Sequence, residues 1–174
     1  MKKEFNLAFI DGQNLHLGTT QNGWKVDNAK FRIYLKDKYK VSEAYYFLGY
    51  VTEEQQELYK NLQRSGFIVL FREHSENLKA IKKGNVDTDI VFEIMKTLIE
   101  RKDFKQILLV SGDGDYKKLA DYLLIKGRLK KLLFPNRQFA SSLYKKLPPA
   151  NFDYLDTVSI RAKIGYRQKK KRSP

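Results

Sequence analysis

The stretch QILLVSGDGDYKKLADYLLIKG (106–127) contains the features that decide the fold of this chain. QILLV (106–110) is a short apolar run, which predicts a buried strand of a parallel sheet. SGDGD (111–115) follows as a sharp turn. DYKKLADYLLIKG (115–127) has the spacing of an amphipathic helix that ends at Gly127. A strand, a turn and a helix in this order are typical of a βαβ unit.

The same alternation of apolar runs and helical patterns extends along the chain in both directions. We predict further strands at residues 6–10, 41–50, 67–72, 130–135 and 152–156, and further helices at 27–39, 52–65, 86–102 and 138–146. Residues 11–26 and 73–85 are predicted to be loops. Right-handed crossovers place helices on both faces of such a sheet. The expected fold class is therefore α/β, a three-layer α/β/α sandwich with a mostly parallel, Rossmann-like sheet.

The formal net charge is +14, and it is unevenly distributed. Residues 161–174 carry seven Lys and Arg and no acid, which is half of the excess. We expect a single domain over residues 1–160, followed by a basic, flexible tail at 161–174. Such a tail attracts phosphate backbones by releasing their counterions, without reading sequence. A solubilising terminus is the alternative interpretation.

Composition excludes several classes of site. The chain has no cysteine, so a disulfide framework, a thiolate zinc site and a cysteine nucleophile are impossible. The apolar run near the N-terminus is too short for a signal peptide and is interrupted by Asp11, and no run is long enough to span a membrane. A cytoplasmic protein without a membrane partner is the expectation. The predicted edge strand at 152–156 leaves open a homo-oligomer.

Acidic residues follow the ends of predicted strands or open a predicted helix. Asp11 follows LAFI, Asp113 and Asp115 follow ILLVSG, and Asp87 and Asp89 lie at the start of the helix at 86–102. The carboxyl ends of parallel strands line one crevice, so we expect these distant acids to converge there. Neighbouring carboxylates repel one another unless a cation or a proton neutralises them. In a strongly basic chain, this pattern favours a metal site that acts on a polyanion.

Each acid also has an ordinary interpretation. Asp11 suits a turn, and Asp87, Asp113 or Asp115 suits a helix N-cap. Asn14 is expected either to position Asp11 or a phosphate, or to be a turn residue. Neither DTD nor DGD completes a calcium-binding EF-hand loop, and SGDGD lacks the GK[ST] of a P-loop.

The two histidines, His16 and His74, are isolated in the sequence and are interpreted as structural or surface residues. No Ser-His-Asp spacing supports nucleophilic catalysis. Tyr116, Phe134 and Phe139 are candidates for stacking on a base, with burial in the core as the alternative.

Three stretches together, FIDGQNL (9–15), KKGNVDTDIVFEIM (82–95) and LLVSGDGDYKKLADYL (108–123), resemble the NYN domain family of the PIN-like nuclease superfamily. The resemblance covers roughly residues 5–157, and the most specific part is SGDGDY with the helix after it. It implies a Rossmann-like sheet and an acidic pocket that binds Mg²⁺ or Mn²⁺. It also implies cleavage of RNA.

The resemblance assigns roles to residues of this chain. Asp11, Asp87, Asp113 and Asp115 would be the metal-binding and catalytic residues. Asn14 and Ser111 would support them, and Asp89 would either support them or face solvent. Lys82 and Lys83 would hold the phosphodiester, with a solvated loop as the alternative. The expected partner is single-stranded RNA, whose flexible backbone can be bent toward the metal. A weakly catalytic or non-catalytic nucleic-acid-binding module, and a phosphatase acting on small substrates, are the alternatives.

Overall fold

The computed structural model describes residues 4–49, 51–72 and 86–167. Within them, six strands form one parallel sheet in the order β3-β2-β1-β4-β5-β6. The strands are β1 (Asn6–Asp11), β2 (Val41–Leu48), β3 (Ile68–Phe71), β4 (Ile107–Val110), β5 (Leu129–Phe134) and β6 (Phe152–Tyr154). This is the doubly wound order, whose topological switch point lies between β1 and β4.

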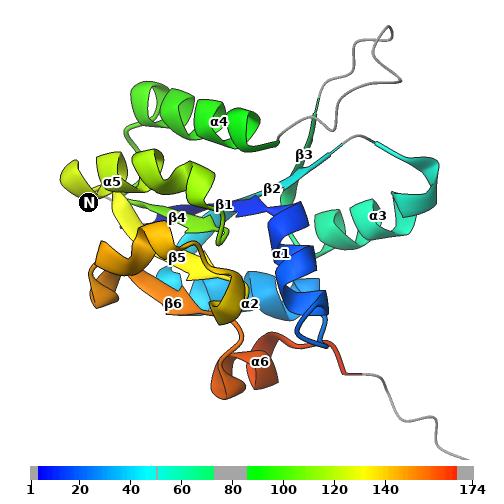
Figure 1. The fold of residues 1–174 in the computed structure, drawn as a ribbon. Helices are drawn as coiled ribbons and strands as arrows, with labels where there is room; N and C mark the ends of the chain where they lie inside the picture. The colour runs from blue at the N-terminus through cyan, green and yellow to red at the C-terminus, as the bar shows by residue number, and fades with distance from the viewer. Residues whose placement is uncertain (1–3, 50, 73–85, 168–174) are drawn as a thin grey trace, which may run out of the picture.

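Helices cover both faces of this sheet, which confirms the predicted three-layer α/β fold. The helices are α1 (Gly12–Thr20), α2 (Asn28–Tyr39), α3 (Gln56–Arg64), α4 (Val86–Glu100), α5 (Lys117–Ile125) and α6 (Val158–Ile164). Buried residues of α4 and α5 form one hydrophobic core with the sheet, and those of α1, α2, α3 and α6 form a second core on the opposite face. Figure 1 shows α4 and α5 on one side of the sheet and α2 and α6 on the other.

The central strand β1 is buried along its whole length and connects the two cores. Leu7 and Phe9 point into the core under α4 and α5, whereas Ala8 and Ile10 point into the other core. Side chains alternate between the two faces of a strand. The same alternation directs Asp11, the last residue of β1, toward α4 and α5 at the carboxyl edge of the sheet.

The loop predicted at residues 11–26 is wrong, because α1 follows β1 directly. Two glycines lower the helix propensity of this segment and concealed the helix. Both are required by close packing. A Cβ on Gly12 would lie 2.5 Å from the Phe47 carbonyl oxygen, and one on Gly18 would lie 2.7 Å from Cβ of Pro135.

Helix α6 continues to Ile164 and packs on the domain, so the predicted flexible tail does not begin at residue 161. Helix α6 crosses that boundary, and Ile160 and Ile164 are buried against the core that contains α2. Residues four positions apart lie on one face of a helix, which explains the packing of this isoleucine pair. The interpretation from charge alone overlooked that face. Residues 168–174 lie outside the described residues.

Two smaller differences complete the comparison with the predicted elements. The predicted helix at 138–146 is instead two 3-10 helices, η4 (Arg137–Phe139) and η5 (Ser142–Lys146). The predicted loop at 73–85 lies outside the described residues. None of the described helices has both the length and the apolar character needed to cross a membrane.

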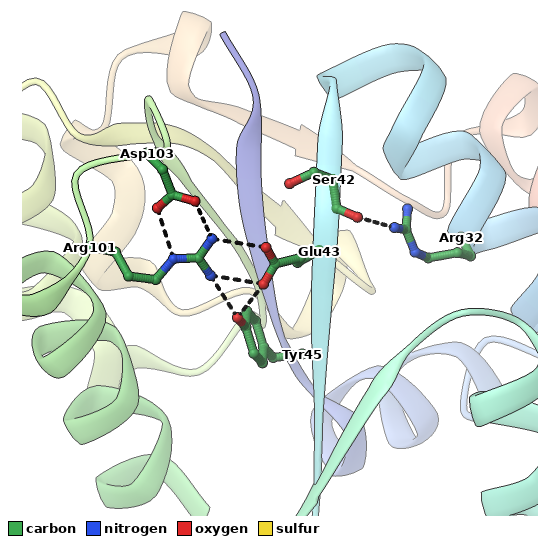
Figure 2. A network of polar contacts seen from close by, with 6 residues as sticks. All are labelled: Arg32, Ser42, Glu43, Tyr45, Arg101 and Asp103. Atoms are coloured by element: carbon green, nitrogen blue, oxygen red, sulfur yellow. Dashed lines mark hydrogen bonds and ion pairs between the residues drawn. The ribbon is translucent and has the colours of Figure 1, made fainter. Parts of the chain in front are cut away.

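An ion-pair network joins the amino-terminal part of β2 to the segment between α4 and β4 (Figure 2). Arg101 donates to both carboxylate oxygens of Glu43, at 2.8 and 2.9 Å, and to both of Asp103, at 2.9 and 2.7 Å. The hydrogen bonds from Arg101 lower the pKa of Glu43 below its ordinary value. Burial and the hydrogen bond to Glu43 raise the pKa of Tyr45 to about 12. At this end of the sheet, the acids are therefore matched to a cation.

Candidate metal centre

Asp11 is the deepest acid at the carboxyl edge, with 5% of its surface exposed. Its Oδ1 accepts a hydrogen bond from the backbone N–H of Asn14 at 3.0 Å, so it caps α1. A cap of this kind satisfies one of the N–H groups that the first turn of a helix leaves without a partner. The other carboxylate oxygen, Oδ2, accepts a hydrogen bond from the Tyr116 hydroxyl at 3.1 Å. Asp11 therefore caps α1 and also lies at the switch point of the sheet.

Asp113 follows β4 as the N-cap of the 3-10 helix η3 (Gly114–Tyr116), and Asp115 lies within that helix. Oδ1 of Asp113 accepts a hydrogen bond from the backbone N–H of Asp115 at 3.0 Å, which is also a capping contact. The side chain of Asp115 is exposed. Gly114 permits the tightness of the turn, since a Cβ there would lie 2.6 Å from Oγ of Ser141.

Asp87 approaches this turn from a different part of the chain, in the first turn of α4. Carboxylate oxygens of Asp87, Asp113 and Asp115 all lie within 4.8 Å of one another. Asp11 is not a member of this triad, but it lies next to it through a shared hydrogen-bond donor. The structure therefore brings together acids that are far apart in the sequence.

Tyr116 is the shared donor, and the sequence analysis did not assign it this role. Its side chain is fully buried, and its hydroxyl lies 2.7 Å from Oδ1 of Asp87 and 3.1 Å from Oδ2 of Asp11. Burial, the charge of Asp11 and the hydrogen bond to Asp87 raise the pKa of Tyr116 well above its ordinary value. The phenol therefore stays protonated and holds the two carboxylates close together.

The repulsion among these acids is most evident in the pKa of Asp11. Burial raises the pKa of Asp11, and the charges of Asp87 and Asp113 raise it further. The hydrogen bonds from Asn14 and Tyr116 act in the opposite direction. A divalent cation placed among the carboxylates would offset both the desolvation and the repulsion.

Three further side chains fix the turn that carries Asp113. Oδ1 of Asn14 accepts from the N–H of Gly112 at 2.9 Å, which joins α1 to this turn. Oγ of Ser111, a fully buried residue, accepts from the N–H of Asp113 at 3.1 Å. Tyr144 donates its hydroxyl to the Asp113 carbonyl oxygen. Tyr144 was missed in the sequence because a buried tyrosine has the pattern of an ordinary core residue.

Other candidates named in the sequence lie elsewhere. Asp89 follows Asp87 by two helical positions, which turns it about 200° away around α4. It lines a different pocket, with Leu70 and Phe92. Lys82 and Lys83 lie outside the described residues.

The three candidates for stacking on a base differ in their exposure. Tyr116 and Phe134 are 0% and 2% exposed, so neither can stack on a base. Phe139 is 61% exposed.

The triad fits a hard divalent cation. The groups that could serve as ligands are all carboxylates, whose oxygens Mg²⁺ and Mn²⁺ prefer, and the triad contains no thiolate or imidazole that would favour zinc. Around an ion with bonds of about 2.0–2.1 Å, ligand oxygens are separated by roughly 3 to 4 Å. Oxygens within 4.8 Å of one another need only small side-chain rotations to reach that geometry.

A parallel sheet in this order, with acids gathered at its switch point, defines an α/β domain with a candidate site for a divalent cation. The NYN domain model matches residues 7–148. The chain belongs to the NYN domain family, which confirms the resemblance seen in the sequence. Membership of this family implies a nuclease-like fold.

Two individual proteins resemble the chain over most of its length. The low amplitude and bright protein LabA of Synechococcus elongatus is 25% identical over 165 residues, which cover 90% of this chain and 85% of LabA. The crystal structure of a protein of unknown function from Vibrio parahaemolyticus superposes with a TM-score of 0.70 at 19% identity. The superposition covers 95% of this chain and 98% of the Vibrio protein. The second likeness supports the fold alone.

Proposed function

We propose that this protein is a metal-dependent ribonuclease that hydrolyses phosphodiester bonds of single-stranded RNA. The observation that carries the proposal is the convergence of Asp87, Asp113 and Asp115 beside the buried Asp11. We assign the metal, Mg²⁺ or Mn²⁺, to the triad, with Asp11 as a further acid of the site. Asn14 and Ser111 support the site by fixing the turn. Bound there, the cation would polarise the phosphate and lower the pKa of an attacking water.

The residues of the chain supply position and charge. Tyr116 sets the separation of Asp11 and Asp87, and the caps at Asp11 and Asp113 hold both carboxylates in fixed directions. No cysteine is present, and the proposed hydrolysis by water requires no covalent nucleophile.

A polyanionic substrate is supported by lysines around the site. The 3-10 helix η5 contacts η3, the turn that carries Asp115, and it presents Lys145 and Lys146 to solvent. Lys118 is exposed in the first turn of α5. Cations on these two elements, both of which contact η3, attract a phosphate backbone to this part of the surface. This arrangement favours a nucleic acid over a small phosphate ester.

Cleavage of end-labelled single-stranded RNA tests the proposal. The wild-type protein is incubated with Mg²⁺, with Mn²⁺ and with a chelator. Asp113→Asn is compared with Asp103→Asn, the same change at the acid that pairs with Arg101. We expect metal-dependent cutting that Asp113→Asn reduces about a thousandfold, because the cation supplies several kcal/mol of transition-state stabilisation. Asp103→Asn should retain it.

Equal rates for the two variants, or cutting that survives the chelator, would contradict the proposal. RNA that is bound by the wild type and by Asp113→Asn, but cut with neither metal, would indicate a nucleic-acid-binding module on the same fold. The two variants are prepared identically, so a contaminating nuclease would appear in both.

A further inference from the structure

A second concave site lies on the other side of the junction between β1 and α1. It is a cavity of about 620 Å³, within the range of small-ligand pockets. Its walls come from α1, from the end of β2 and from the segment that leads into α3. The residues that matter most for its chemistry are Gly12, Leu15, His16, Tyr46, Leu48 and Leu58.

The pocket and the acidic site share a boundary. Gly12 lines the pocket and directly follows Asp11 in the chain. The Tyr46 ring packs so closely against Gly12 that a Cβ on Gly12 would lie 2.5 Å from Cε1 of Tyr46. Both sites therefore open at the carboxyl edge of the sheet, where doubly wound domains bind their ligands. A chain crossing this edge would meet the acids on one side of Gly12 and the pocket on the other.

Polar groups in the pocket have hydrogen-bonding capacity that the described part of the protein does not use. Tyr46 is 6% exposed, and among the described residues its hydroxyl has no hydrogen-bond partner. The side chains of Gln13, His16 and Lys25 also line the pocket and make no hydrogen bond within the same part of the chain. The Tyr46 hydroxyl is not one of the fully buried polar atoms that lack a partner, so it faces the pocket, where a ligand would meet a free donor and acceptor.

We propose that this pocket binds one base of the single-stranded RNA whose phosphate lies at the acids, an inference that rests on the proposed function. Leu48 and Leu58 provide apolar surface for the faces of the base, and the polar side chains meet its edge. Single-stranded RNA suits this geometry because its unstacked bases can turn out of the chain and enter a pocket. The pocket thereby selects the nucleotide next to the bond that is cut.

Nuclear magnetic resonance of the imidazole of His16 tests the pocket without cleavage. The chain has two histidines, so a His74→Gln variant assigns the two sets of signals. Adenosine 5′-monophosphate and uridine 5′-monophosphate are titrated at constant pH with a chelator present. Ribose 5-phosphate serves as the control because it has the sugar and the phosphate but no base. We expect the His16 signals to shift with at least one nucleotide and to stay in place with ribose 5-phosphate.

Two variants test the contacts of the base. Tyr46→Phe keeps the ring and removes the hydroxyl, so it should weaken nucleotide binding roughly threefold to tenfold, the worth of one hydrogen bond. Leu58→Trp should fill the pocket and weaken binding further. Tyr122→Phe is the matched control, because Tyr122 is on α5 and is 42% exposed. Melting temperatures close to that of the wild type establish that the variants are folded.

The outcomes separate this inference from the proposed function. If RNA is cut but His16 responds equally to nucleotides and to ribose 5-phosphate, the base pocket is wrong and the nuclease assignment stands. If His16 responds to nucleotides alone and Tyr46→Phe weakens that response, the pocket stands even where no cutting is found. Equal nucleotide affinities of Tyr46→Phe, Leu58→Trp and the wild type would overturn the pocket.

Discussion

The amino and carboxyl ends of the parallel sheet both gather acidic side chains, but they neutralise them differently. At the amino end, a single guanidinium donates to both oxygens of Glu43 and of Asp103. At the carboxyl end, Asp113 and Asp115 form no ion pair within the described part of the chain, although they lie close to Asp87. The first arrangement suits stability, since the protein supplies its own counter-charge. The second suits the proposed binding, since an external cation would complete it.

Among changes that keep every acid in place, we expect the largest effect from the hydroxyl that joins Asp11 to Asp87 at the carboxyl end. Tyr116→Phe removes the hydroxyl between Asp11 and Asp87 and keeps the buried ring. Groups that orient metal ligands typically contribute about 10-fold to 100-fold in metal affinity. The Mn²⁺ concentration that gives half-maximal RNA cleavage should rise by this factor. Tyr122→Phe should leave it unchanged.

The Mn²⁺ requirement of Tyr116→Phe shows whether Tyr116 positions the acids or only packs in the core. A variant that only loosened the core would melt at a lower temperature but keep the same Mn²⁺ requirement. That result would show that Tyr116 does not position the acids.

We expect an intermediate effect on the free energy of unfolding when one charge is removed at either end of the sheet, measured with a chelator present. Arg101→Gln leaves Glu43 and Asp103 without their cation and should lower the free energy of unfolding by roughly 1 kcal/mol, allowing for solvent screening. Asp115→Asn removes one negative charge from the triad and should raise the free energy of unfolding. Urea denaturation measures both changes. A shift of both variants in the same direction would contradict this comparison. With Mn²⁺ in place of the chelator, the wild type should be more stable than Asp115→Asn, because only the intact site gains the free energy of binding.

The smallest expected effect is the pH dependence of stability that Glu43 contributes at the amino end. The folded pKa of Glu43 is lowered from its ordinary value of 4.5, mainly by the hydrogen bonds from Arg101. A carboxyl group with a lowered folded pKa contributes stability above its unfolded pKa and loses it as the pH falls through the folded pKa. The stability difference between the wild type and Glu43→Gln should therefore be constant above the unfolded pKa and shrink below it. A difference that grew on acidification would contradict this assignment.

Much of the fold was predictable because its signals are local. Apolar runs marked the five strands from 6–10 to 130–135 and the edge strand at 152–156. Asp11 follows one of these runs directly, and Asp113 follows another after Ser111 and Gly112. Helix α1 was not predictable from the sequence, because Gly12 and Gly18 are there for contacts with β2 and Pro135 that only the folded chain reveals. Helix α6 was overlooked because charge was considered before the spacing of Ile160 and Ile164.

The candidate site shows the same division. The approach of Asp87 to Asp113 follows from strand order, which the pattern of elements indicates. The separation of Asp89 from Asp87 was predictable from helical spacing alone. The part played by Tyr116 was not, because a fully buried tyrosine resembles any aromatic core residue until its hydroxyl is placed between two acids.

Calorimetric titration with Mn²⁺ tests the central claim most directly, namely that the carboxyl-end acids form a divalent cation site. The wild-type protein, Asp113→Asn and Asp103→Asn are titrated under the same conditions. We predict saturable binding to the wild type and to Asp103→Asn, and its loss in Asp113→Asn. Binding that is absent from the wild type, or unchanged by Asp113→Asn, would contradict the account.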